Sequence, residues 1–300
     1  MKHRDMIDRV AHELRDHPLF DPSKHDDLWL LRFVMGHCCS SSSSSSTMTM
    51  SHQSKKRREK AIRAVLDAVD YTLKFRESHG LDEHDLRHLP PSGDCRHPRS
   101  HSLQRYLMYC DHQAIWHCLP DSARGVVSYL QVSGIHQHEL ATNLDERHWL
   151  PMYLYVCEWT HQCLDYTTRT TGRFTKCVRM ANLDTILFSG LNMEGLRRDA
   201  RVMETLNECY PEMLDKIFVC QAPSWVQVPY RIMKPLLPKS LLEAFDFISP
   251  RTNERERRDL FKYVSEDNLP TQYGGRNDEW VVRRKVPNVT RSKSIMVGSF

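Results

Sequence analysis

The sequence predicts an α/β protein preceded by a small all-α bundle, and two observations lead to this fold class. Between residues 172 and 275, segments with strand character alternate with segments of helical periodicity. The order is strand, long amphipathic helix, buried strand, apolar helix, short strand and polar closing helix. The strand at residues 217–220 is continuously apolar, which is typical of a parallel sheet covered on both faces.

Composition predicts a cytoplasmic protein that binds no nucleic acid. The formal charge of +4, from 42 basic and 38 acidic residues, is too small to indicate nucleic acid and is compatible with an anionic membrane surface. The first residues lack an apolar signal core, and no run approaches the roughly 20 apolar residues of a spanning helix. We therefore expect the ten cysteines to be reduced thiols.

Residues 1–90 predict the helical bundle. A weak amphipathic helix at residues 5–15 ends before Pro18, and a second helix begins at Asp26 and Asp27, which suit its positive N-terminal end. A third helix, residues 59–77, carries apolar side chains on one face and ends at Gly80.

A serine-rich insertion at about residues 36–58 separates the second and third helices. The tract Ser40 to Ser46 has no apolar surface to bury, so we expect the insertion at about residues 36–58 to be disordered. The favoured interpretation is a spacer, and the alternative is a phosphorylation segment beside the basic run at residues 55–58.

Residues 102–110 and 114–118 predict short strand-like pieces. Residues 125–132 are β-branched and apolar and predict a central strand. A helix begins near residues 143–146, and a further strand covers residues 174–183. Two registers of this strand are equally favoured: Cys177 and Arg179 point inward in one and outward in the other, because a one-residue slip reverses the faces.

The C-terminal part contains the most informative segment. After a helix at residues 195–210 and the buried strand, residues 224–237 are apolar around much of a helix, with prolines at 229 and 235. Such a helix is buried, or it covers something apolar on one side and meets a membrane on the other. A short strand at 245–249, a helix at 254–264 and a basic tail at 276–300 follow.

Four short motifs occur in a fixed order along this part of the chain. They are Tyr210-Pro211-Glu212, Ala222-Pro223, Lys234-Pro235-Leu236-Leu237 and Leu269-Pro270-x-x-Tyr273-Gly274-Gly275. The series resembles the lipid-binding core of the CRAL-TRIO family, which includes phosphatidylinositol transfer proteins and carriers of tocopherol and retinal. The run of residues 27–33 is similar to the Asp-x-x-Leu-Leu-Arg-Phe segment of the bundle before that core.

The resemblance implies a mainly parallel sheet that floors a hydrophobic pocket closed by helices, formed by residues 91–275. It implies one bound lipid or other lipophile, transferred between membranes or presented to partner proteins, and a transient membrane surface as partner. Residues 224–237 correspond to the gate helix that opens the pocket. The implied lipid-binding residues are Tyr129, Cys177, Arg179, Glu212, Trp225, Tyr230, Met233, Leu236 and Leu237, with Lys234 and Lys239 as possible headgroup or membrane contacts.

Three residues characterise the phosphoinositide-binding members: a glutamate after Tyr-Pro, a lysine before the last apolar strand and a basic residue in the bundle. Glu212 matches the first, whereas the other two positions fall on Glu243-Ala244 and near Cys38. The resemblance therefore predicts a hydrophobic ligand, with phospholipids and phosphoinositides as the first classes.

No enzyme motif is present, and we predict a protein without catalysis, metal or cofactor other than its lipid. The chain lacks a phosphate-binding Gly-rich loop, a His-Glu-x-x-His pair and a nucleophile elbow. Its histidines and cysteines do not form two paired clusters at zinc spacing. The alternative function is a regulatory interaction module of the same fold, whose degenerate pocket is filled by its own side chains.

Overall fold

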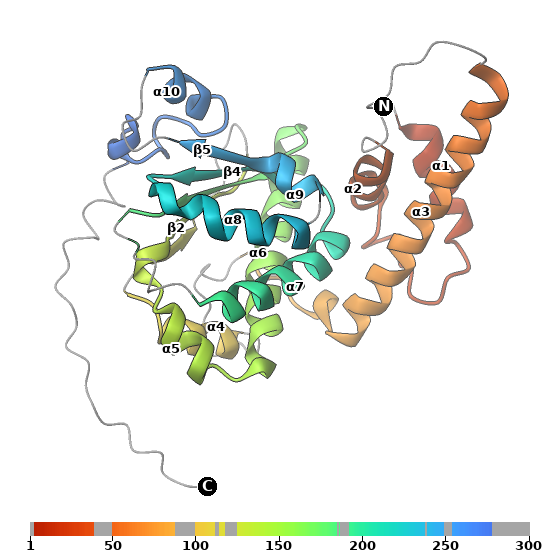
Figure 1. The fold of residues 1–300 in the computed structure, drawn as a ribbon. Helices are drawn as coiled ribbons and strands as arrows, with labels where there is room; N and C mark the ends of the chain where they lie inside the picture. The colour runs from red at the N-terminus through yellow and green to blue at the C-terminus, as the bar shows by residue number, and fades with distance from the viewer. Residues whose placement is uncertain are drawn as a thin grey trace, which may run out of the picture.

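The computed structural model of the protein describes residues 3–38, 50–87, 100–111, 114–117, 125–184, 186, 192–237, 239–248 and 254–277. Three helices at the N-terminus form a bundle with its own core: α1 (Arg4–Glu13), α2 (Asp27–Cys38) and α3 (Met50–Ser78) (Figure 1). Asp26 caps α2 as predicted, because its Oδ1 accepts hydrogen bonds from the backbone N–H groups of Leu28 and Trp29.

The helix α3 begins earlier than the sequence predicts. Residues 36–38 belong to α2 and residues 50–58 to α3, so the expectation of disorder is wrong for these two stretches. Residues 50–58 contain methionine, glutamine, lysine and arginine, which are good helix formers and extend the helix backwards. The tract Ser40 to Ser46 lies outside the described residues. At the other end, Gly80 adopts a left-handed φ of 52° after the helix, as expected.

A five-stranded sheet in the order β1-β2-β3-β4-β5 forms the centre of the main domain. Its strands are β1 (Ile115–His117), β2 (Val127–Gln131), β3 (Cys177–Asn182), β4 (Leu214–Cys220) and β5 (Phe245–Ile248). The strand β1 pairs antiparallel with β2, and the remaining neighbours are parallel. The predicted α/β class with a mainly parallel sheet is confirmed.

One face of the sheet is sealed by α10 (Glu254–Phe261) and the chain after it. Val178, Met180 and Phe218 pack there against Leu260 and other apolar side chains that follow α10. The chain closes through η8 (Thr271–Tyr273) and the two glycines of the last motif. Gly274 has a φ of 92°, and a Cβ at Gly275 would lie 1.9 Å from the carbonyl oxygen of Leu269, so neither position accepts another residue without strain.

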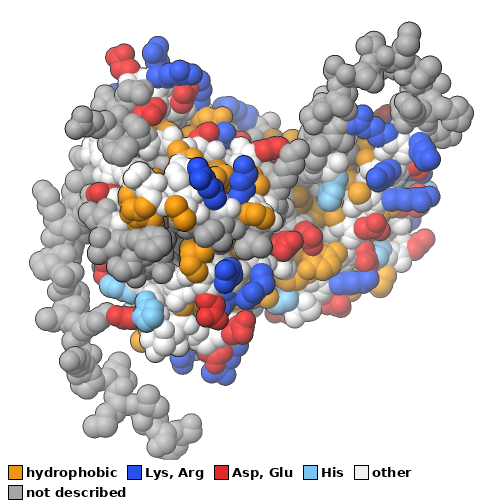
Figure 2. All heavy atoms as spheres, viewed as in Figure 1, with side chains coloured by type: hydrophobic (Ala, Val, Ile, Leu, Met, Phe, Trp, Pro, Cys, Tyr) orange, Lys and Arg blue, Asp and Glu red, His pale blue; other side chains and the backbone are white. Residues whose placement is uncertain are grey.

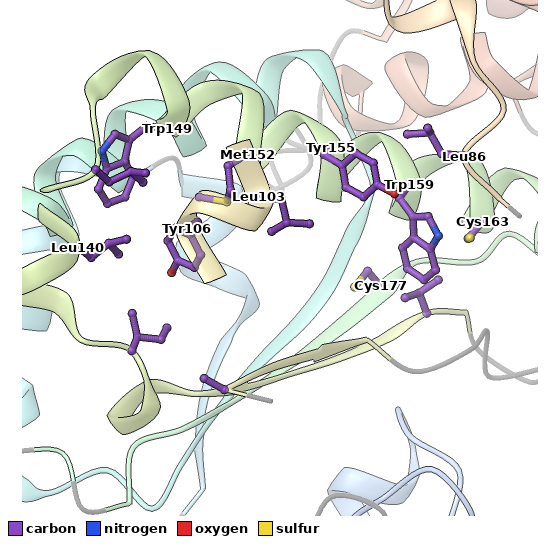
Figure 3. Packing of buried hydrophobic residues seen from close by; sticks show 14 of the residues in the cluster. Leu86, Leu103, Tyr106, Leu140, Trp149, Met152, Tyr155, Trp159, Cys163 and Cys177 are labelled. Carbon is purple, nitrogen blue, oxygen red and sulfur yellow. The ribbon is translucent and has the colours of Figure 1, made fainter. Parts of the chain in front are cut away.

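Helices cover the opposite face of the sheet, as Figure 1 shows. They are α4 (Ser100–Leu107), α5 (Gln137–Asn143), α6 (Trp149–Thr171), α7 (Met193–Cys209), α8 (Gln227–Met233) and α9 (Lys239–Ala244), with short 3-10 turns η2 (Leu81–Glu83), η3 (Val132–Gly134), η4 (Glu146–His148), η6 (Ser224–Val226) and η7 (Lys234–Leu236). Figure 3 shows Tyr155 and Trp159 of α6 pointing toward Cys177 of the sheet. The apolar core between α6 and the sheet is thus filled at the start of β3.

Two sequence predictions in this region are wrong or incomplete. Residues 102–110 were expected to be strand-like, yet residues 100–107 form the helix α4. Its Leu103, Tyr106 and Leu107 recur at helical spacing and pack against the core under α6, so tertiary contact overrides the weak local preference. The helix α5 is absent from the prediction. By contrast, β1 lies within the second predicted strand-like piece, residues 114–118.

A buried ionic network joins the bundle to the main domain. Arg76 of α3 donates two hydrogen bonds to Glu158 of α6, at 3.1 and 3.0 Å, and two more to Asp82. Tyr210 and Gln162 also donate to Glu158, at 2.8 and 3.0 Å. Burial alone would raise the pKa of Glu158, but the charge of Arg76 lowers it to about 2, so the carboxylate stays ionised.

We expect Glu158→Gln to lower the free energy of unfolding by about 3 kcal/mol, because it weakens a buried pair and leaves part of the Arg76 charge uncompensated. Urea unfolding of the full chain measures the change. Asp259→Asn is the control: Asp259 forms an exposed pair with Lys262, so its loss should leave the free energy of unfolding nearly unchanged. Equal effects of the two substitutions would contradict the role assigned to the network.

Candidate functional site

The alternation of burial along β3 separates two unlike faces of the sheet. Val178 and Met180 point toward α10 and are buried, whereas Arg179 and Ala181 point toward the helices of the other face and are only half-buried. The strand β3 lies between β2 and β4, where side chains under a layer of helices are normally buried. Arg179 and Ala181 therefore keep accessible surface on the face of the sheet that packs on the helices.

The structure resolves the two registers that the sequence leaves open. Cys177 and Arg179 share the face that packs on α6, and Cys177 is buried beside Trp159 in the core of that face. Burial raises the pKa of the Cys177 thiol to about 11, which keeps it protonated and apolar. Along β3, the buried core of this face therefore includes Cys177 but not the half-buried Arg179.

A polar cluster surrounds Arg179. Tyr106 of α4 and Tyr153 of α6 lie within electrostatic reach of its guanidinium. The hydroxyl of Tyr153 donates a hydrogen bond of 2.9 Å to Oδ1 of Asp199 on α7. Burial raises the pKa of Asp199 from its usual 3.8 to about 7, although the Tyr153 hydrogen bond and Arg198 act in the opposite direction. Three helices and one strand thus bring two tyrosines, an acid and an arginine together.

The side chain of Arg179 makes no ion pair and no hydrogen bond with any residue in the part of the chain that the structure describes. The buried Arg76, by contrast, is held by the carboxylates of Asp82 and Glu158. A guanidinium that loses solvent without gaining an anion is unfavourable. The site therefore has a positive charge without an anionic partner among the described residues.

The helix α8, predicted as the gate, covers the sheet next to β5. The ring of Tyr230 packs edge-on against Phe245 and Phe247, with centroid distances of 5.9 and 5.3 Å. By the sheet register, these phenylalanines share the face of Arg179 and Ala181. Trp225 and Leu237 are half-buried at the two ends of the segment.

Of the other predicted residues, one lies on the exterior of the molecule, and three have side chains that the structure does not describe. Lys234 is exposed, and Val228 is exposed over 53% of its surface. The backbones of Met233, Leu236 and Lys239 belong to α8, η7 and α9, but their side chains lie outside what the structure describes. The segment is apolar on both sides, as predicted, at Tyr230 toward the sheet and at Val228 toward solvent.

The structure corrects the placement of Tyr129. Tyr129 pairs with Met180 in the register of β2 and β3, so it points to the sealed face, away from Arg179. Its hydroxyl donates to the backbone carbonyl of Asn268. Because successive side chains of a strand alternate, Tyr129 and Arg179 cannot line one cavity. Tyr129 instead fixes the closing segment to the sheet.

Glu212 lies at the junction with the bundle rather than beside Arg179. Its carboxylate forms an ion pair of 2.5 Å with Lys176, and its backbone carbonyl accepts a hydrogen bond of 3.1 Å from Arg32 of α2. Its φ of 58° is uncommon for a residue with a Cβ. Both contacts hold this turn between α7 and β4, so the predicted headgroup contact of Glu212 requires a ligand that competes with Lys176.

A polar pocket of about 420 Å³ lies between the bundle and α6. It is lined by His25, Arg76, Glu158, His161 and other polar residues, so it differs from the hydrophobic pocket expected from the sequence. The Nε2 atom of buried His25 has no hydrogen-bond partner in the described structure. The arginines of the pocket are already paired with carboxylates, which leaves little free charge for a ligand.

The described residues contain neither a metal-ligand cluster nor a membrane-spanning helix. No three His, Cys, Asp or Glu side chains gather in a way that could hold a metal ion. No helix in the described ranges is both long and apolar enough to cross a bilayer.

The sequence predicts Arg179 but misses Tyr106, Tyr153 and Asp199 as site residues. A signal for Asp199 is present, because it falls between Leu196 and Met203 on the inward stripe of the amphipathic helix α7. A carboxylate on such a stripe needs a buried partner. The partner, Tyr153, comes from another helix, and no local pattern announces that pairing.

Comparisons with known proteins connect this arrangement to one family. The CRAL/TRIO domain matches residues 111–275. Patellin-4 of Arabidopsis thaliana is 32% identical over 75 residues, which are 25% of this chain and 13% of that protein. Patellin-3 of the same plant is 32% identical over 87 residues, 29% of this chain and 17% of that protein. The chain thus matches only a small part of the length of either relative.

A solved structure supports the same fold. The crystal structure of Sfh5 superposes with a TM-score of 0.53 at 12% sequence identity, covering 76% of this chain and 72% of that one. At this identity the similarity concerns the fold alone.

The raised pKa of Asp199 predicts how stability depends on pH. Between its usual pKa of 3.8 and the folded value of about 7, the folded protein holds a proton that the unfolded chain releases. The contribution of Asp199 is therefore fully present below pH 3.8 and is lost as the pH rises through 7. We expect Asp199→Asn to gain more than about 1 kcal/mol relative to the unmodified protein between pH 5 and pH 8.

Urea unfolding at these two pH values measures the difference. Glu204→Gln, an exposed position on the same helix, should leave the pH dependence unchanged. A parallel pH dependence of Asp199→Asn and the unmodified protein would contradict a buried, proton-binding Asp199.

Proposed function

The chain belongs to the CRAL/TRIO domain family, and from this membership we propose that it binds one lipid or other small lipophile between the sheet and helices α6, α7 and α8. The observation that supports this place is the half-exposed surface of Arg179 and Ala181 on a central strand under helices. The hydrocarbon of the ligand would fill this space against Ile217 and Val219, which lie on the same face in the adjacent strand. Burial of a hydrocarbon chain stabilises the complex by about 0.8 kcal/mol per CH₂ group.

The helix α8 supplies the means of transfer in this proposal. Its Tyr230 packs on the sheet, and it presents Val228 to solvent with the exposed Arg231 and Lys234 nearby. Figure 2 shows basic side chains standing among hydrophobic ones on the face formed by α7 and α8. Such a surface suits transient contact with an anionic membrane, where α8 could move aside and admit a monomeric lipid. The protein would thus act in the cytoplasm and peripherally at membranes.

In this proposal the protein is a carrier and not an enzyme, and the bound lipid is its only small-molecule ligand. Phospholipids and phosphoinositides are the first ligand classes to test. The carboxylate of Glu212 is already paired with Lys176. A phosphoinositide headgroup that contacts Glu212 would therefore have to compete with Lys176.

Native mass spectrometry of the purified full chain, followed by organic extraction, tests the proposal. We expect one lipophile per chain, or uptake of one after incubation with mixed liposomes. A chain that stays empty under both conditions would contradict the carrier function. That result would support the alternative, an interaction module whose space is closed by its own side chains.

The exposed valine of α8 gives a second prediction. We expect Val228→Glu to slow transfer of a fluorescent phospholipid between liposomes by about 3- to 10-fold, because a charge at the membrane interface costs roughly 1 kcal/mol. The control is Tyr166→Glu, which places the same charge at another exposed apolar residue, on α6. The amount of bound lipid should be the same in both variants and in the unmodified protein. Equal transfer rates of all three proteins would exclude α8 as the membrane contact.

A further inference from the structure

The proposed function leaves open which kind of lipophile the site selects, and Arg179 bears on this choice. Resting on that function, we propose that the ligand is an amphipathic acid whose anionic group, a carboxylate or a phosphate, is held inside the fold by Arg179. Its hydrocarbon part would extend over Ala181 toward α8.

Arg179 carries a charge that no described residue neutralises. The guanidinium of Arg179 emerges from the middle strand of the sheet, is half-buried, and has no anionic partner among the described residues. Desolvation of a charge without a partner is costly, and replacement of the lost water by an anion removes this cost. A guanidinium also offers parallel N–H donors that match the two oxygens of a carboxylate or phosphate. A neutral lipophile would leave the arginine unpaired.

The buried side chains near Arg179 are neutral. Tyr106, Tyr153 and Cys157 stand around Arg179, and all three are held in their neutral forms by burial, which raises the pKa of each. Burial raises the pKa of Cys157 to about 12. Charged hydrogen bonds are stronger in such a poorly solvated setting than in water. The cluster therefore favours an anion over water at Arg179.

Apolar side chains on the same face of the sheet give the direction in which the hydrocarbon part of the ligand would extend. Ala181 follows Arg179 on the same face, and Val219 is its neighbour in β4. Phe247 is the next residue across the sheet, and it contacts Tyr230 of α8. These side chains form an apolar row from the arginine to the lid. An acid bound at Arg179 would thus enter with its head first and its chain toward α8.

The experiment compares matched pairs of ligands on the delipidated full chain at constant ionic strength. One pair is palmitic acid and cetyl alcohol, and the other is lysophosphatidic acid and the corresponding monoacylglycerol. We expect the preferred acid to bind at least about 10-fold more tightly than its neutral partner, as one charged contact provides. The pair with the larger ratio identifies carboxylate or phosphate as the natural head.

Substitutions assign the preference to the arginine. We expect Arg179→Leu and Arg179→Gln to lower the affinity for the acid about 10- to 100-fold and to change the affinity for the neutral partner less than about 2-fold. The matched control is Arg197→Leu, which removes an exposed arginine of α7 and should change neither affinity.

Two results would overturn the inference, and they differ in what they say about the proposed function. If neutral and acidic ligands bind equally and Arg179→Leu changes neither, the carrier function stands and the acidic ligand is wrong. If no lipophile of either kind binds, both are wrong. Thermal unfolding of each variant verifies that it is folded, and the glutamine variant serves if the leucine variant is not.

Discussion

The alternation of side chains along β3 is the constraint on which the arrangement of the molecule depends. A strand in the middle of a parallel sheet sends its residues to two faces, and in this protein the two faces are unlike. Met180 and its neighbours seal one face against α10. Arg179 and Ala181 keep exposed surface on the other face, although helices cover it. The period of two residues therefore determines which side chains of β3 face the helices.

The covered face changes in character along the strand. At its start, Cys177 meets the aromatic side chains of α6 and the core is filled (Figure 3). Two residues later, Arg179 replaces this packing with a charge and is surrounded by Tyr106 and Tyr153. Further across the sheet, aromatic rings under α8 restore an apolar surface. A site for one amphipathic molecule needs a polar group beside an apolar surface, and this face offers Arg179 next to the aromatic rings under α8.

The bundle contributes by holding the opposite end of the domain rigid. Arg76 and Arg32 both reach from bundle helices into the main domain, the first to Glu158 and the second to the carbonyl of Glu212. Tyr210, which also donates to Glu158, is the C-terminal cap of α7. Since α7 also carries Asp199 and packs against α8, the network fixes the helix that borders the site.

Much of the fold could be predicted because its signals are local. The apolar run of residues 217–220 and the order of the short motifs identify the parallel sheet and its family. The predictions fail where distant contacts decide: α4 is a helix because its apolar side chains meet α6, and residues 50–58 extend α3. The family resemblance implies a pocket position for Tyr129, but the register turns it toward α10. The pairing of Tyr153 with Asp199 joins two helices and leaves no pattern in either.

Photo-crosslinking tests the central claim, that the lipophile lies between the sheet and α8, most directly. A phospholipid or fatty acid with a diazirine on its hydrocarbon chain is loaded into the full chain, irradiated and mapped by peptide mass spectrometry. We expect crosslinks in β3 and in residues 224–237, the two walls of the proposed site. Crosslinks confined to the pocket beside His25 and His161, or to the outer face of α10, would contradict an internal site under α8.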